Sequence, residues 1–205
     1  MKTITLQVGP IMTNCYILCD DETKVCAVVD PGADADRVAQ TVAETGCAPA
    51  CMLLTHGHYD HTDAVEELLE KFPGIPVYLN HRDVYDETDR RMRQLFPHLP
   101  ATVSYDDGDA VRVGSLTVSV LATPGHSAGS VTLLCGDVMF AGDTLFAGSC
   151  GRTDLASGSV DDMLASLARL GRLEREYSVL PGHMGASILS REREYNPFML
   201  QALRG

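Results

Sequence analysis

Four residues that commonly bind metals lie within six positions of the sequence, in the segment Thr55-His56-Gly57-His58-Tyr59-Asp60-His61. Imidazole and carboxylate ligands together suit zinc, iron or manganese, and they must converge from a rigid support. The segment directly follows the apolar residues Cys51–Leu54, which predict a short buried strand. A solvated turn is the alternative interpretation, but a turn needs glycine and polar residues, not three imidazoles. We therefore predict that His56, His58, Asp60 and His61 are metal ligands.

Three more candidate ligands follow apolar stretches later in the chain. His126 and His183 each come after a Pro-Gly pair, in Thr123-Pro124-Gly125-His126-Ser127 and Pro181-Gly182-His183. Either histidine alone would be read as a loop residue without a role, but with the first cluster both become candidate ligands. Asp143 follows Gly142 and by itself would be a turn-former. A two-metal site, however, needs an oxygen ligand between ions about 3.5–4 Å apart, and a carboxylate has two oxygens for this.

The elements around these residues predict an α/β protein in which two sheets face each other and helices lie outside. The first half reads as three strands, a helix over Asp34–Glu44, a strand at Cys51–Leu54, a helix over Asp63–Phe72, a strand at Val77–Leu79 and a helical stretch from Arg82 to Leu95. The second half reads as four strands between Ala110 and Phe140, a helix over Val160–Leu173, a strand at Ser178–Leu180 and a C-terminal helix. No linker separates the halves, so we expect one domain over residues 1–205.

The charge and composition of the chain limit the classes of partner that it is expected to bind. The net charge of −12 disfavours nucleic acid and anionic membranes, which attract clustered Lys and Arg. No signal peptide or long apolar span is recognised, and the seven cysteines contain no C-x-x-C pair, so we expect a cytoplasmic protein with reduced thiols. A small-molecule substrate fits this composition, and the sequence does not indicate the oligomeric state.

The order T-H-x-H-x-D-H, G-H, G-D-T and P-G-H, from Thr55 to His183, resembles the metallo-β-lactamase superfamily. The resemblance extends to Asn14-Cys15-Tyr16 and Asp30-Pro31-Gly32 and so covers nearly the whole chain. It implies an αβ/βα four-layer sandwich with two divalent metal ions, for which zinc is the first expectation and iron or manganese are alternatives. It further implies two ligand triads, one for each ion. The first triad is His56, His58 and His126, and the second triad is Asp60, His61 and His183. Asp143 is implied to bridge the two ions.

Within the superfamily, the chain is most similar to short bacterial glyoxalase II proteins, the hydroxyacylglutathione hydrolases. The segments Gly148–Asp154 and Asn196–Phe198 carry this likeness, although the helical domain that supplies much of the glutathione contact in full-length glyoxalase II is not expected here. The likeness implies hydrolysis of a thioester such as S-lactoylglutathione by a metal-bound hydroxide, with Asp60 as the catalytic residue that orients it. His61 argues against the common class of β-lactamases, and His58 against oxygen-reducing diiron relatives.

Three other functions stay open. A persulfide dioxygenase resembles the chain in the same segments and implies a single iron on His56, His126 and Asp143. A catalytically silent metal-binding module is the second, although structural zinc sites are usually closed and rich in cysteine. RNA processing is a weaker third. Arg152 and Asp154 are interpreted equally well as a buried ion pair that holds a loop and as substrate-binding residues.

Overall fold

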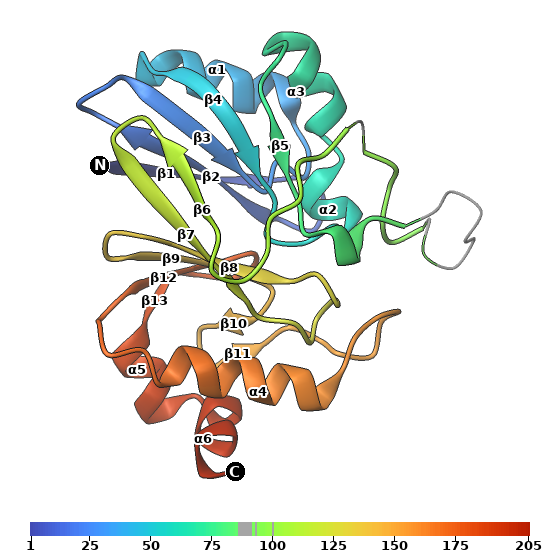
Figure 1. Cartoon of the computed structure of the whole chain (residues 1–205), viewed down its shortest axis with the longest axis vertical. Helices are drawn as coiled ribbons and strands as arrows, with labels where there is room; N and C mark the ends of the chain where they lie inside the picture. The colour runs from blue at the N-terminus through green and yellow to red at the C-terminus, as the bar shows by residue number, and fades with distance from the viewer. Residues whose placement is uncertain (86–91, 93, 100) are drawn as a thin grey trace.

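Two β-sheets face each other in the computed structural model, which describes residues 1–85, 92, 94–99 and 101–205 (Figure 1). The first sheet has the order β1-β2-β3-β4-β5, and the second has the order β13-β12-β9-β8-β7-β6. Helices α1 and α3 cover the outer face of the first sheet, while α4, α5 and α6 cover the outer face of the second. The arrangement is an αβ/βα four-layer sandwich, which confirms the predicted fold.

The first half of the chain forms the first sheet and its helices. Its strands are β1 (Lys2–Val8), β2 (Thr13–Asp20), β3 (Val25–Val29), β4 (Ala48–Leu53) and β5 (Val77–Tyr78), and its helices are α1 (Ala35–Thr45), α2 (Tyr59–Thr62) and α3 (Val65–Lys71). The β1-β2-β3 pairs are antiparallel, and β3-β4 and β4-β5 are parallel. Helix α1 ends at Gly46, which has φ +68° and caps the helix in the left-handed conformation.

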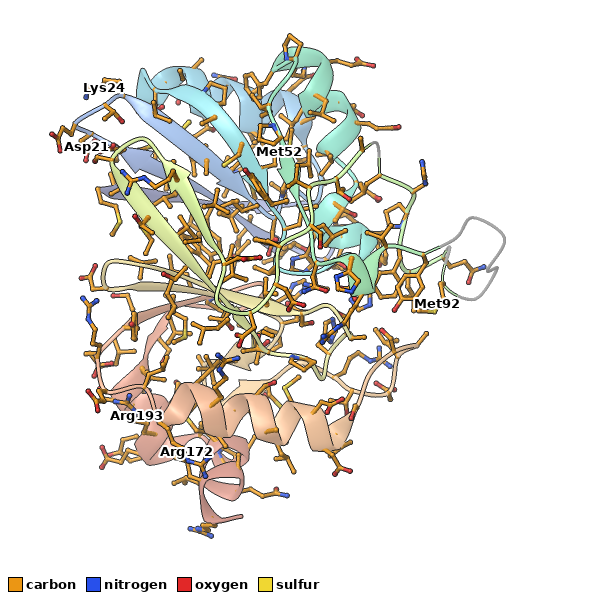
Figure 2. All side chains as sticks on the ribbon, in the orientation of Figure 1. Asp21, Lys24, Met52, Met92, Arg172 and Arg193 are labelled. Carbon is orange, nitrogen blue, oxygen red and sulfur yellow. The ribbon has the colours of Figure 1, made fainter. Side chains whose placement is uncertain are left out.

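The second half supplies the second sheet. Its strands are β6 (Ala110–Val113), β7 (Leu116–Ala122), β8 (Val131–Cys135), β9 (Val138–Gly142), β12 (Ser178–Pro181) and β13 (Ser187–Ile188), and its helices are α4 (Val160–Gly171), α5 (Leu189–Tyr195) and α6 (Pro197–Arg204). Strands β10 (Leu145–Phe146) and β11 (Ser149–Cys150) pair separately. Arg193, labelled in Figure 2, donates to the carbonyl oxygens of Gly171 and Leu173 and so supplies partners at the end of α4.

Three apolar clusters fill the spaces between the four layers. Strand β2 shows why, because its side chains alternate between the two faces of the sheet. Cys15, Ile17 and Cys19 pack toward α1 and α3 with Met52, whereas Tyr16 and Leu18 pack against the second sheet. All eight residues of β2 are buried, as expected for a strand covered on both faces.

The predicted helical stretch from Arg82 to Leu95 falls mostly on residues 86–91 and 93, which lie outside the described residues. Its described part includes a 3-10 turn, η1 (His81–Asp83). The C-terminal helix is divided into α5 and α6 by Asn196, whose side chain accepts from the backbone N–H groups of Phe198 and Met199 and starts a new helix. Among the described residues, no helix combines the length and apolar character needed to cross a membrane.

Candidate metal centre

All seven predicted ligands lie together at the ends of strands. His56 and His58 follow β4, and the short helix α2 then carries Asp60 and His61. The remaining three come from the second sheet, where each follows the C-terminal end of a strand. They are His126 after β7, Asp143 after β9 and His183 after β12. The structure therefore brings residues from both sheets to one edge of the sandwich.

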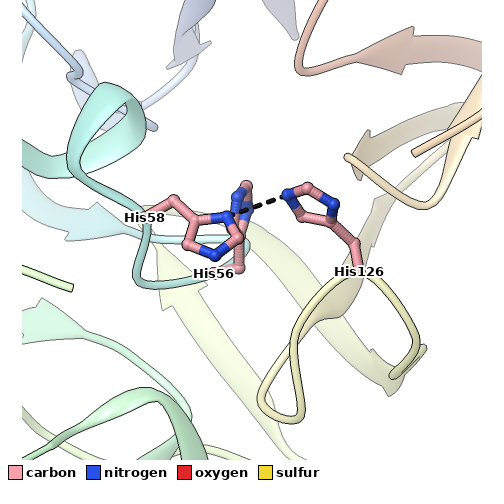
Figure 3. A group of neighbouring side chains, drawn as sticks. All are labelled: His56, His58 and His126. Carbon is pink, nitrogen blue, oxygen red and sulfur yellow. Dashed lines mark hydrogen bonds between the residues drawn. The ribbon is translucent and has the colours of Figure 1, made fainter. Parts of the chain in front are cut away.

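The first triad consists of His56, His58 and His126, which are 0%, 3% and 4% exposed (Figure 3). His58 Nδ1 lies 2.8 Å from His126 Nε2, and the His56 ring meets both other rings edge-on. Burial, together with the neighbouring His126 and His61, lowers the pKa of His58 to about 3. Burial also lowers the pKa of His56. Both rings are therefore neutral, which is the form of imidazole that binds a metal.

The second triad consists of Asp60, His61 and His183. Asp60 Oδ2 lies 3.1 Å from His183 Nε2 and 3.3 Å from His61 Nε2. Burial raises the pKa of Asp60, but the contacts with His183 and His61 outweigh it and hold the pKa well below its usual range. The Thr13 hydroxyl donates to the same oxygen at 3.1 Å and fixes the carboxylate from the first sheet. Asp60 thus offers an ionised and oriented oxygen donor.

Asp143 lies between the two triads. Its Oδ2 is 3.4 Å from His126 Nε2 and 3.5 Å from His183 Nε2, while its Oδ1 is 3.5 Å from His61 Nε2. One carboxylate therefore faces nitrogen donors of both triads. The bridging role of Asp143 stays a prediction, and a carboxylate in this position could be shared by two ions.

The neighbours of the triads hold the histidine rings in place. Asp30 Oδ2 lies 3.1 Å from His61 Nδ1, and the same carboxylate accepts from the backbone N–H and the hydroxyl of Thr55, each at 2.7 Å. His126 Nδ1 contacts the Arg152 carbonyl oxygen at 2.7 Å. Such contacts select the tautomer and orientation of a ligating ring. From the sequence, Asp30 is recognised only as part of a motif shared with the superfamily, and its position directly after β3 is the signal for its role beside His61.

Asn14 links the first sheet to the loop that carries His183. Its side-chain amide donates to the carbonyl oxygens of Pro181 and Met184, both at 2.9 Å, and its backbone N–H donates to Gly182 at 2.7 Å. Asn14 is 3% exposed, so these bonds are shielded from water. They attach the start of β2 to the loop that carries His183.

The interpretation of Arg152 and Asp154 as a buried ion pair is wrong. Their side chains do pair, with Arg152 Nε 2.7 Å from Asp154 Oδ1, but they are 61% and 67% exposed. An exposed pair of this kind contributes little to stability. His81 and His98, the two histidines outside the ligand set, are exposed.

The donor set fits divalent ions. Within the described part of the chain, four buried ligand atoms have no hydrogen-bond partner, namely His56 Nε2, His58 Nε2, His61 Nε2 and Asp143 Oδ1. Unpaired buried polar atoms are costly, and a metal ion would satisfy them. The two triads and Asp143 are therefore suited to a dinuclear site of mixed nitrogen and oxygen ligands.

We expect added metal to stabilise the protein. An ion that binds only the folded chain raises the free energy of unfolding, by about 2.7 kcal/mol at a free concentration 100 times its Kd. Chelator-treated protein should therefore show a lower Tm, which zinc, manganese or iron(II) should restore in a concentration-dependent way. Magnesium, which prefers all-oxygen sites, serves as the control. Identical Tm values with and without the three ions would contradict this prediction.

The layered fold and its His/Asp cluster at strand ends are those of a metallo-hydrolase. The chain belongs to the metallo-β-lactamase superfamily, whose family model matches residues 8–183. A probable metallo-hydrolase of Bacillus subtilis, YqgX, is 35% identical over 97% of this chain and 98% of its own length. A hydroxyacylglutathione hydrolase of Hamiltonella defensa is 36% identical over 85% of this chain, and the match spans 64% of that relative.

Three solved structures share the fold along almost the whole chain. ETHE1 from Myxococcus xanthus is 32% identical, with a TM-score of 0.82, and the match covers 96% of this chain and 84% of that one. The di-iron-bound form of TTHA1623 is 33% identical, with a TM-score of 0.81 and coverage of 95% and 99%. The BLEG-1 B3 metallo-β-lactamase is 34% identical, with a TM-score of 0.79 and coverage of 97% and 99%. These likenesses confirm the predicted family.

Proposed function

We propose that this protein hydrolyses a small thioester, such as S-lactoylglutathione, at a dinuclear metal site. The observation that carries the proposal is the position of Asp143, whose two oxygens face His126 and His183 on one side and His61 on the other. A single ion would need only one triad, whereas here a second set of ligands is assembled around the same carboxylate. The 36% identity to a hydroxyacylglutathione hydrolase supports a thioester substrate.

The residues of the chain have separate tasks in this proposal. The two bound ions, for which zinc is the first choice, would supply a Lewis acid for the thioester carbonyl and a water of lowered pKa. His56, His58 and His126 offer buried nitrogen donors. Asp60, held by Thr13 and His183, is the acceptor that orients the attacking water. Water adds to the carbonyl carbon, the C–S bond breaks, and an acid and a thiol are released.

A hollow beside the centre is suited to the substrate. It has a volume of about 340 Å³ and is lined by the loop of Cys150 and Arg152 and by apolar side chains including Met163. The backbone at Arg152 contacts His126 directly, so the hollow adjoins the first triad. The Arg152 guanidinium at the rim of this hollow is paired with Asp154, at 2.7 Å between Arg152 Nε and Asp154 Oδ1.

The test combines metal analysis with substrate assays on the purified protein. Two ions per chain, with S-lactoylglutathione hydrolysed to acid and thiol, are the expected result. Chelator-treated protein is the matched control, because it has the same amino-acid sequence but no bound ions. One iron per chain, together with oxygen consumption on glutathione persulfide and no hydrolysis, would refute the proposal.

A persulfide dioxygenase is the second candidate, and the likeness to ETHE1 favours it. His56, His126 and Asp143 lie together as the single-iron alternative requires, with His126 Nε2 3.4 Å from Asp143 Oδ2. That alternative leaves the triad of Asp60, His61 and His183 without a task, which is why we prefer hydrolysis. Because BLEG-1 is a B3 metallo-β-lactamase, a β-lactam substrate belongs in the same assay panel.

We further propose a cytoplasmic protein whose partner is a small molecule rather than nucleic acid or a membrane. The net charge of −12 supports this, since it repels polyanions. Substrate attraction then depends on local positive charge, which the bound ions would supply.

A further inference from the structure

A buried carboxylate outside the ligand set joins the two loops of the first triad. Asp83, at the end of the 3-10 turn η1, is 2% exposed. Its Oδ2 accepts from the Gly57 backbone N–H at 2.9 Å and from the Ser127 hydroxyl at 2.6 Å. Its Oδ1 accepts from the Gly129 backbone N–H at 2.7 Å. All three donors therefore point at one side chain that binds no metal in the proposed site.

The donors are next to the ligands in sequence. Gly57 lies between His56 and His58, and Ser127 directly follows His126. One side chain thus holds the β4 loop and the β7 loop at a set separation, although these loops are 68 residues apart at His58 and His126. The two rings it controls approach to 2.8 Å between His58 Nδ1 and His126 Nε2, so a small shift of either loop changes the distance between the donor atoms.

The contact is close as well as polar. A Cβ atom on Gly129 would lie 2.6 Å from Asp83 Cγ, so only glycine allows this approach. Ser127 Oγ is also 2.7 Å from Ser130 Oγ, and the Ser127 backbone N–H donates to the same Ser130 oxygen at 3.1 Å. The β7 loop is therefore closed on itself and attached to Asp83 as a unit.

We infer that Asp83 is a positioning residue that sets the affinity of the first triad for its ion. The second triad is held by other groups, with Asp30 on His61 and Thr13 on Asp60. Loss of Asp83 should therefore weaken the binding of the ion at the first triad and leave the binding of the other ion unchanged. This inference rests on the proposed dinuclear site but not on its substrate.

The variant Asp83→Asn tests this with little change in volume. An amide in place of the carboxylate turns one acceptor into a donor, which must face the N–H of Gly129 or the groups at Gly57 and Ser127. Loss of a group that orients ligands typically costs about 10–100-fold in metal affinity. We expect one zinc ion to bind about 10–100-fold more weakly and the other with unchanged affinity, measured by titration against a chromophoric chelator. Ser127→Ala, which removes one of the three bonds, should have a smaller effect in the same direction.

Asp20→Asn is the matched control. Asp20 is also 2% exposed and accepts from Thr23 and from the backbone N–H and hydroxyl of Ser115, but it lies at the opposite end of β2 from Thr13. Both Asn variants remove a buried acceptor and should lower Tm, yet only Asp83→Asn should change a zinc affinity. If Asp83→Asn binds both ions like the wild type while its Tm falls as in Asp20→Asn, Asp83 is only structural and the inference is wrong. A wild-type chain that binds fewer than two ions would instead refute the dinuclear site itself.

Discussion

Replacement of Asp143 by alanine is expected to reduce thioester hydrolysis by at least about 10²–10³-fold, the effect typical of removing one electrostatic contact to a transition state. The physical reason is that one carboxylate faces donors of both triads, at 3.4–3.5 Å. Without it, the nitrogen donors of His61, His126 and His183 surround a site with one negative charge fewer. Metal content measured by elemental analysis should fall below two ions per chain.

The control for this variant flanks the same strand, β9. Asp137 is an exposed carboxylate just before β9, whereas Asp143 is 7% exposed just after it. Asp137→Ala should keep wild-type turnover and metal content. Full activity with two bound ions in Asp143→Ala would show that the carboxylate is not a shared ligand.

Substitution of Gly182 by alanine is expected to abolish most of the activity, because the added methyl group would displace groups of the site. A Cβ atom at this position would lie 2.2 Å from Asp143 Oδ1 and 2.6 Å from His61 Cε1, distances that require one of the ligands to move. The displaced groups belong to the bridge and to the second triad. We expect at least about a 100-fold loss of activity, in line with the effect of a misplacement of about 1 Å in a catalytic site.

Gly185, three residues along the same loop, offers a close comparison. A Cβ atom there meets nothing within 4 Å, so Gly185→Ala should retain activity and metal. Circular dichroism and Tm measurements on both variants separate a local displacement from general unfolding. Equal activities in the two alanine variants would mean that the loop moves away from Asp143 freely, against the tight packing described above.

The ligands could be predicted because they follow strand ends, where apolar periodicity stops and polar residues begin. His126, Asp143 and His183 each had an ordinary interpretation alone, and only their joint occurrence with the first cluster indicated a site. The four layers followed from strand and helix order together with the family resemblance. Strands β10, β11 and β13 were not predicted, because each has two residues and two residues carry no period.

The residues that sequence analysis missed act over long separations. Asp83 meets Gly57, Ser127 and Gly129 across 26, 44 and 46 positions, and its local sequence shows no sign of this. The exposure of Arg152 and Asp154 could not be predicted either. Their opposite charges, two positions apart, indicate an ion pair but do not show whether the pair is buried or exposed. Such properties depend on which segments the fold brings together.

Because the predicted ligands come from both sheets, a bound ion would cross-link the two sheets. His56 and His58 belong to the first sheet and His126 to the second, and the other triad is divided in the same way between Asp60 with His61 and His183. An ion bound to either triad therefore closes a chain loop, much as a disulfide bond does, and restricts the separation of the two sheets. Loss of metal should thus loosen the edge where the ligand loops of the two sheets meet before it loosens the apolar packing between the layers.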